Sequence, residues 1–120
     1  MDHSKEFVAL VDDAKQRVRE IDIDALDARR RAGARLIDVR EDDEFRAGHL
    51  PGAEHIGKGV IERDIVAKVP DKDAELILYC GGGFRSLLAG DALGKMGYTR
   101  VFSLIGGWRD WTKRALPTEK

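Results

Sequence analysis

The stretch Leu76–Ser86 reads LILYCGGGFRS, and it holds a strand pattern, a glycine loop and the start of a helix pattern. Its first four residues form a short apolar run, which predicts a buried strand. The three glycines predict a tight loop between this strand and the helix. Such strand-loop-helix units build α/β folds, in which ligands bind beyond the carboxyl ends of the strands. The stretch therefore predicts the fold class and the place of a functional site.

The rest of the chain repeats this alternation of short apolar strands and amphipathic helices. Strands are predicted at residues 21–23, 36–39, 53–56, 76–79 and 101–104. Helices are predicted at residues 4–20, 24–33, 42–45, 60–66, 85–96 and 108–113. Together these elements predict an α/β domain with a mainly parallel central sheet of about five strands and helices on both faces.

Local signals predict where several helices begin and end. Asp24 and Asp42 are placed to act as N-caps. Gly33 and Gly97 are placed to end their helices. The helix at residues 85–96 is expected to bury the following side chains: Leu88, Ala92, Leu93 and Met96.

The composition is that of one small domain with nearly balanced charge. The 120 residues include 21 Lys and Arg, 22 Asp and Glu, and one cysteine. This balance gives no support for binding nucleic acid or an anionic membrane. Residues 1–20 carry charges throughout and lack the apolar stretch of a signal peptide or membrane span. We expect a cytoplasmic protein without metal or other cofactor, and its oligomeric state stays open.

Cys80 lies where a thiol is expected to be reactive. Backbone N–H groups of the glycine loop and the helix start converge beyond the strand and stabilise negative charge. The thiolate, which is the nucleophilic form of cysteine, is favoured in such a place. The alternative is that Cys80 is a small buried hydrophobic residue. Three consecutive glycines argue against it, because each costs backbone entropy and contributes no packing.

Four segments together resemble the rhodanese-like sulfurtransferase family. They are LIDVRE at residues 36–41, GHLPGA at 48–53, CGGGFRS at 80–86 and GGWRDW at 106–111. The resemblance extends over residues 21–116. It implies a rhodanese-like domain over residues 21–120, with residues 1–20 as an N-terminal amphipathic helix extension. It also implies that Cys80 carries a covalent persulfide.

The resemblance implies further site residues. The persulfide charge is expected to be held by the backbone N–H groups of Gly81, Gly82, Gly83, Phe84 and Arg85. The Arg85 side chain is expected to strengthen the positive field, or alternatively to pair with a nearby carboxylate. Lys58 and Arg63 lie in a segment that often lines the pocket in this family. They are candidate contacts for a donor oxyanion, and the alternative is that both are solvated.

The three histidines are not expected to act in catalysis. His49 lies in the segment Gly48–Gly52, whose glycines and proline favour a structural corner over a general base. His3 lies in the N-terminal tail and His55 in an edge strand, and neither belongs to a catalytic motif.

Two further pairs of residues are predicted to be structural. Asp38 and Arg40, two apart at a strand end, are expected to satisfy loop backbone groups and each other. Trp108 and Trp111 lie three apart on one helical face and are expected to pack against the core.

The expected reaction is a sulfur transfer in two displacement steps. The Cys80 thiolate attacks the outer sulfur of thiosulfate or a persulfide, and a thiol or cyanide then removes that sulfur. Such a division predicts ping-pong kinetics. With no second cysteine in the chain, the acceptor must be another molecule.

Two other functions remain as alternatives. The chain could be a non-catalytic module that binds a partner or senses persulfides or oxidants. It could also be a small phosphatase or arsenate reductase. Against the latter, the loop from Cys80 to Arg85 has six residues, one fewer than in related phosphatases. A shorter ring of N–H groups fits a single sulfur better than a tetrahedral oxyanion.

Overall fold

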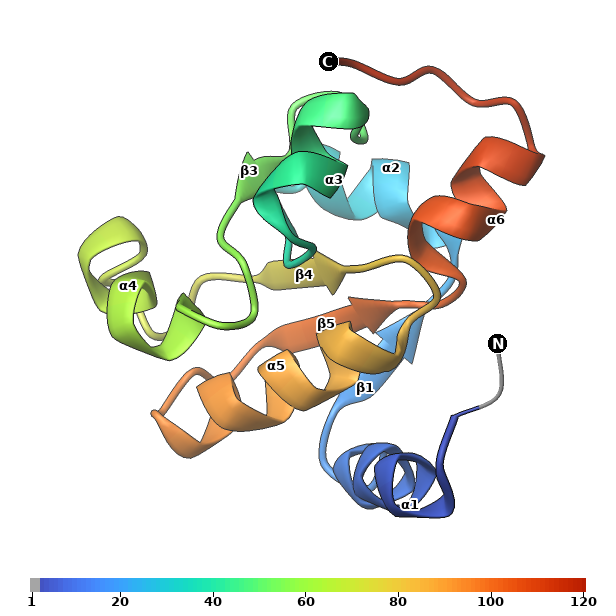
Figure 1. Cartoon of the computed structure of the whole chain (residues 1–120). Coiled ribbons are helices and arrows are strands. Elements are labelled where there is room, and N and C mark those ends of the chain that lie inside the picture. Colours follow the sequence, from blue (N-terminus) through green and yellow to red (C-terminus); the bar gives the residue numbers. More distant parts are fainter. Residues whose placement is uncertain (1–2) are drawn as a thin grey trace.

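The computed structural model describes residues 3–120, and its centre is a five-stranded sheet (Figure 1). The strands are β1 (Arg19–Ile21), β2 (Arg35–Asp38), β3 (Glu54–His55), β4 (Leu76–Tyr79) and β5 (Val101–Leu104). They lie in the order β1-β5-β4-β2-β3, and each neighbouring pair is parallel. The predicted α/β class and parallel sheet are confirmed, and β4 is the middle strand.

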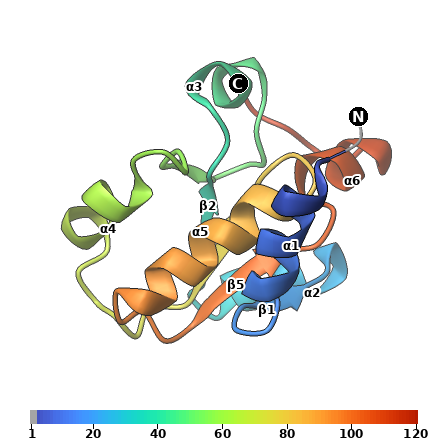
Figure 2. The same ribbon diagram turned by 60° about the horizontal axis from the view of Figure 1, so that its bottom comes forward.

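Helices cover both faces of this sheet, as predicted. They are α1 (Lys5–Ala14), α2 (Ile23–Arg31), α3 (Asp42–Ala47), α4 (Ile61–Lys68), α5 (Phe84–Lys95) and α6 (Gly107–Lys113). Side chains of α4 and α5 pack on one face, and those of α2 and α6 on the other. Helix α1 lies outside these layers and packs along α5 (Figure 2). In the described part of the chain, every helix falls short of the length and apolar character that crossing a bilayer requires.

Successive residues of β4 point to opposite faces of the sheet. Leu76, Leu78 and Cys80 face the layer of α4 and α5. Ile77 and Tyr79 face the layer of α2 and α6. All five are fully buried. A strand with helices on both sides needs such a continuous apolar run, and for that reason the sequence predicts its bounds well.

The first helix is shorter than predicted, because it ends at Ala14 rather than near residue 20. Residues 19–21 form β1, which pairs with β5. Val18 lies beyond the helix end but packs in the same apolar cluster as Val11. The spacing of apolar residues therefore continues past the helix, which is why the predicted helix is too long. Since the sheet begins at Arg19, β1 spans the predicted domain boundary at residue 20, and that boundary stays a prediction.

The second helix begins one residue earlier than predicted. Ile23, expected in a strand, is the first residue of α2. The N-cap is Asp22 rather than Asp24, and its carboxylate accepts the N–H of Ala25 at 3.0 Å. Both aspartates are suitable caps. Because β1 pairs with β5 up to Ile21, the chain leaves the sheet at Asp22, and Asp22 becomes the N-cap.

The N-cap of α3 also differs from the predicted one, although the helix begins at residue 42 as predicted. Its N-cap is Glu41 rather than Asp42. Glu41 forms a capping box with Glu44, whose carboxylate accepts the Glu41 N–H at 2.9 Å. This reciprocal arrangement satisfies two otherwise unpaired N–H groups.

The buried face of α5 differs from the predicted one. Its buried residues are Ser86, Leu87, Ala89, Gly90 and Leu93, so of the four predicted side chains only Leu93 is fully buried. The prediction gave this helix a single inner face. In the structure α1 and the segment after it cover a second side, where Val18 lies close to Gly90.

Candidate functional site

Cys80 directly follows β4, at the carboxyl end of the middle strand. Its Sγ accepts a hydrogen bond from the Gly83 N–H at 3.1 Å. Gly83 has a φ of 105°, in the left-handed region, and is the N-cap of α5. Glycine adopts this conformation without strain, and it lets the loop turn an amide back toward the sulfur. The sulfur therefore lies at the positive end of the twelve-residue helix α5.

One of the five loop amides that were predicted to hold the persulfide charge contacts the sulfur of Cys80. Among Gly81–Arg85, all of them described, Gly83 is the residue whose N–H is bonded to Sγ. The persulfide state would carry a second sulfur beyond Sγ, which is the atom that the other four amides were predicted to meet. Their role stays a prediction.

Two buried hydroxyls lie beneath the sulfur. Ser86 Oγ lies 3.6 Å from Cys80 Sγ and 2.7 Å from Ser103 Oγ. Ser86 also donates to the Gly83 carbonyl at 3.2 Å, which ties the helix start to the loop. Ser86 belongs to the loop motif CGGGFRS, and no role was predicted for it. Its partner on β5 was not readable, because that contact depends on strand order.

The first turn of α6 holds the loop from the other side. The N–H groups of Trp108 and Arg109 donate to the carbonyls of Cys80 and Gly81 at 2.8 and 2.9 Å. Gly107 has a φ of 48°, and a Cβ there would collide with the Cys80 carbonyl oxygen. The close approach of α6 to the loop thus requires glycine at this position.

Cys80 borders a cavity of about 510 Å³, although the residue itself is only 1% exposed. The other lining residues are His3, Phe7, Gly82, Phe84, Arg85 and Arg109. The sulfur-bearing residue thus forms part of the wall of an open pocket. A ligand in this pocket would meet the loop, two cations and an aromatic surface.

Arg85 lines this pocket, and its guanidinium is paired with a carboxylate. It donates to Glu44 at 2.9 and 3.2 Å. This hydrogen bond raises the pKa of Arg85 and lowers the pKa of Glu44. The structure shows the alternative reading, in which Arg85 pairs with a carboxylate, and it also places Arg85 in the pocket wall. The predicted contribution of Arg85 to the positive field stays a prediction.

Arg109 is a pocket cation that the sequence analysis missed. Its guanidinium lies beside Gly82, and 69% of its side chain is exposed. Its contact with Asp110 is long, at 4.0 Å. Arg109 is the arginine of the motif GGWRDW, in which a role was predicted only for the two tryptophans. The turn of α6 against the loop brings Arg109 to the pocket.

The structure does not bring Lys58 and Arg63 to this pocket. Arg63 lies on α4 and donates to the neighbouring Asp64 at 2.7 and 3.1 Å. Lys58 follows β3, where its N–H donates to the Val39 carbonyl. Neither residue lines the cavity of Cys80. Their predicted contact with a donor stays a prediction.

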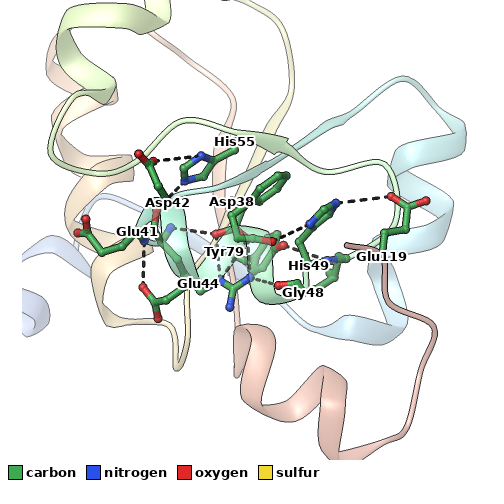
Figure 3. Close-up of polar contacts among 12 residues, drawn as sticks. Asp38, Glu41, Asp42, Glu44, Gly48, His49, His55, Tyr79 and Glu119 are labelled. Carbon is green, nitrogen blue, oxygen red and sulfur yellow. Dashed lines mark hydrogen bonds and ion pairs between the residues drawn. The ribbon is translucent and has the colours of Figure 1, made fainter.

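Asp38 and Arg40 form the predicted pair, and the pair is buried. The Asp38 carboxylate accepts from the Arg40 backbone N–H and from its guanidinium at 2.8 to 3.1 Å (Figure 3). Arg40 also donates to the Gly48 carbonyl at 2.7 Å and lies over the Trp108 ring. Burial and the nearby Asp38 charge raise the pKa of Tyr79. This network joins the end of β2 to α6 and supports the site from behind.

His49 and His55 also have structural contacts (Figure 3). Both rings stack on the Phe45 ring, with ring centroids 3.8 Å apart for His49 and 4.7 Å apart for His55. His49 shares two backbone hydrogen bonds with Glu119, and His55 contacts the Arg40 carbonyl at 2.8 Å. Neither ring lines the pocket of Cys80. His49 was predicted to form a structural corner, and His55 was predicted to lie in an edge strand without a catalytic role. His3, which was predicted to lie in the N-terminal tail, lines the pocket of Cys80.

Comparisons with known proteins agree with this geometry. The family model described as Rhodanese-like domain matches residues 10–114. Thiosulfate sulfurtransferase GlpE of Stutzerimonas stutzeri is 36% identical over 84 residues, which cover 70% of this chain and 75% of that protein. Senescence-associated protein DIN1 of Raphanus sativus is 34% identical over 99 residues, which cover 74% of this chain and 54% of that protein.

A solved structure of rhodanese with anions from E. coli shares the fold, with a TM-score of 0.64 and 34% identity over 73% of this chain and 99% of that chain. DIN1 is one of five curated relatives that are longer than the matched region. The chain spans only 40% to 63% of the length of these five proteins. The matched residues include the four sequence segments, the sheet and the loop of Cys80. The chain therefore belongs to the family of rhodanese-like domains.

Proposed function

We propose that this chain is a sulfurtransferase of the thiosulfate sulfurtransferase type, acting through a persulfide on Cys80. The observation that carries the proposal is the position of Sγ, which accepts the Gly83 N–H at the start of α5 and borders an open cavity. This position stabilises a negative sulfur and leaves space for a donor. Relatives named thiosulfate sulfurtransferase support it.

The chemistry needs no metal or redox cofactor to balance. The Cys80 thiolate attacks the outer sulfur of thiosulfate, a new S–S bond forms, and the old S–S bond breaks with its electron pair leaving on sulfite. An acceptor thiolate or cyanide then attacks the outer sulfur of the persulfide. That step forms a new persulfide or thiocyanate and restores the Cys80 thiolate. Negative charge stays on sulfur near the loop throughout, where the Gly83 amide and the α5 dipole stabilise it.

Intact-mass measurement provides the direct test of this proposal. After incubation with thiosulfate and removal of excess reagent, the protein is expected to gain the mass of one sulfur atom. Cyanide should then remove that mass and release thiocyanate. If thiosulfate and persulfide donors all leave the mass unchanged, the transfer function is wrong. The alternative of a non-catalytic binding or sensing module, which the low exposure of Cys80 favours, would then take its place.

Arg109 is expected to supply most of the positive field that an anionic donor meets, because Glu44 neutralises Arg85. Iodoacetate is anionic and iodoacetamide is neutral, and both alkylate the same thiolate. The rate with iodoacetate divided by the rate with iodoacetamide at Cys80 therefore reports the positive field. For Arg109→Ala we expect this ratio to fall roughly threefold to tenfold, and KM for thiosulfate to rise by a similar factor.

The double variant Arg85→Ala/Glu44→Gln is the matched control. It removes a pair without net charge, and glutamine keeps an oxygen for the Glu41 N–H. We expect the alkylation ratio to change by less than roughly twofold. If the double variant changes the alkylation ratio more than Arg109→Ala does, Arg85 rather than Arg109 supplies the positive field.

The remaining expectations from the sequence are part of the same proposal. The donor is thiosulfate or a persulfide, the acceptor is a thiol or cyanide, and the location is the cytoplasm. The six-residue loop from Cys80 to Arg85 continues to argue against a phosphatase. Hydrolysis of a generic aryl phosphate would overturn that exclusion.

A further inference from the structure

The pocket beside Cys80 is large for thiosulfate. Its volume of about 510 Å³ lies in the range of sites for organic ligands, roughly 300 to 1,000 Å³. Thiosulfate has only five heavy atoms, which are a central sulfur, three oxygens and the outer sulfur. A pocket built only for this ion would need neither the volume nor an apolar wall. The excess space therefore points to a donor with an organic group.

Three aromatic rings form one wall of this pocket. His3 lies 5.0 Å from Phe7 and 5.0 Å from Phe84, and the two phenylalanines lie 6.0 Å apart, all between ring centroids and all tilted. Such tilted contacts are favourable between aromatic rings. All three residues line the cavity, so a further ring entering it would meet the same kind of surface. We call His3, Phe7 and Phe84 the aromatic wall.

Two of these three residues come from outside the part of the chain that the family model matches. The match covers residues 10–114, whereas His3 and Phe7 precede it. Packing of α1 along α5 carries them to the pocket (Figure 2). The N-terminal helix thus gives this pocket a surface that the matched domain alone does not supply.

The same pocket carries positive charge next to its apolar wall. Arg109 lies beside Gly82, and the paired Arg85 lies beside Gly81. A ligand that fits both parts has an anionic head close to the loop and an apolar body against the aromatic wall. Its head must also present a sulfur that the Cys80 thiolate can attack.

We propose that the aromatic wall is a specificity determinant for organic thiosulfonates, R–SO2–S⁻, in which R is aromatic or otherwise apolar. The proposal rests on the function proposed above and specifies its donor class. The thiolate of Cys80 attacks the terminal sulfur, an S–S bond to Cys80 forms, and the sulfur-sulfonyl bond breaks. Its electron pair leaves on the sulfinate, R–SO2⁻, beside the arginines. Charge and atoms balance without a further reagent.

The test compares three donors that share the reacting S–S bond: thiosulfate, methanethiosulfonate and benzenethiosulfonate. The second-order rate of Cys80 persulfide formation is measured by intact mass for each donor. Each rate is divided by that of free cysteine with the same donor, which removes differences between leaving groups. We expect benzenethiosulfonate to exceed methanethiosulfonate by roughly tenfold after this correction.

His3→Ala and Phe7→Ala are each expected to lower this preference by roughly threefold, because the phenyl group of the donor loses part of the surface that it contacts. Leu10→Ala is the matched control, because it removes an apolar side chain from the same helix at a position that is 60% exposed. It should leave the preference unchanged. Should Phe7→Ala fail to fold, Phe7→Leu and the exposed His3→Ala decide the question.

Equal corrected rates for the methyl and phenyl donors in the wild type would overturn the proposal. A preference that survives unchanged in both the His3 and the Phe7 variants would also overturn it, since another surface would then be responsible. In either case persulfide formation from thiosulfate would leave the proposed function standing. Failure of all three donors to load Cys80 would overturn this proposal, and failure of persulfide donors as well would remove the proposed function.

Discussion

Cys80→Ser is expected to abolish sulfur transfer from thiosulfate to cyanide, with a loss in kcat/KM of at least roughly 10³-fold. A serine oxygen cannot form the persulfide, and the chain has no second cysteine to replace it. The hydroxyl would still accept the Gly83 N–H, so the loop keeps its conformation. Steady-state formation of thiocyanate measures the loss.

The fold of this variant has to be checked separately, because Cys80 is buried in the core. Exchanging sulfur for oxygen changes little volume, and Ser86 and Ser103 already provide a polar surface nearby. We expect the thermal unfolding midpoint to lie within roughly 5 °C of the wild type. Transfer activity that persists in a folded, serine-containing protein would show that Cys80 is not the sulfur carrier.

The central part of the fold was predictable because its sequence signals are local. The strands Leu76–Tyr79 and Val101–Leu104 lie where their apolar runs predicted them. The errors arose where tertiary contacts decide the structure. Residues 19 and 20 continue a helical spacing, yet pairing with β5 draws them into the sheet. No pattern within the first 20 residues contains that information.

The candidate site divides in the same way. The sulfur and the Gly83 amide belong to one loop, so the sequence could place Cys80 among the loop amides, although it did not single out Gly83. Arg85 and Glu44 lie 41 residues apart, and their pairing depends on the place of α3 beside the loop. His3 reaches the pocket only because α1 packs along α5. Such long-range neighbours become visible only once the elements are placed.

The pair of Asp38 and Arg40 leads to the largest expected loss of stability. Asp38 is 0% exposed and Arg40 is 3% exposed. For Arg40→Leu we expect the free energy of unfolding to fall by about 3 to 5 kcal/mol, because the variant leaves a buried carboxylate without its partner. The Gly48 carbonyl loses a donor as well. Urea unfolding followed by circular dichroism measures the change.

Arg35→Leu is the matched control for this prediction. Arg35 lies at the start of the same strand and forms a two-point ion pair with Glu54, but both side chains of that pair are more than a third exposed. Exposed pairs contribute about 1 kcal/mol or less, because water solvates each charge when its partner is removed. The same substitution should therefore cost several times less at position 35 than at position 40. Equal losses would mean that leucine disturbs β2 itself, and that burial of the Asp38 charge is not the cause.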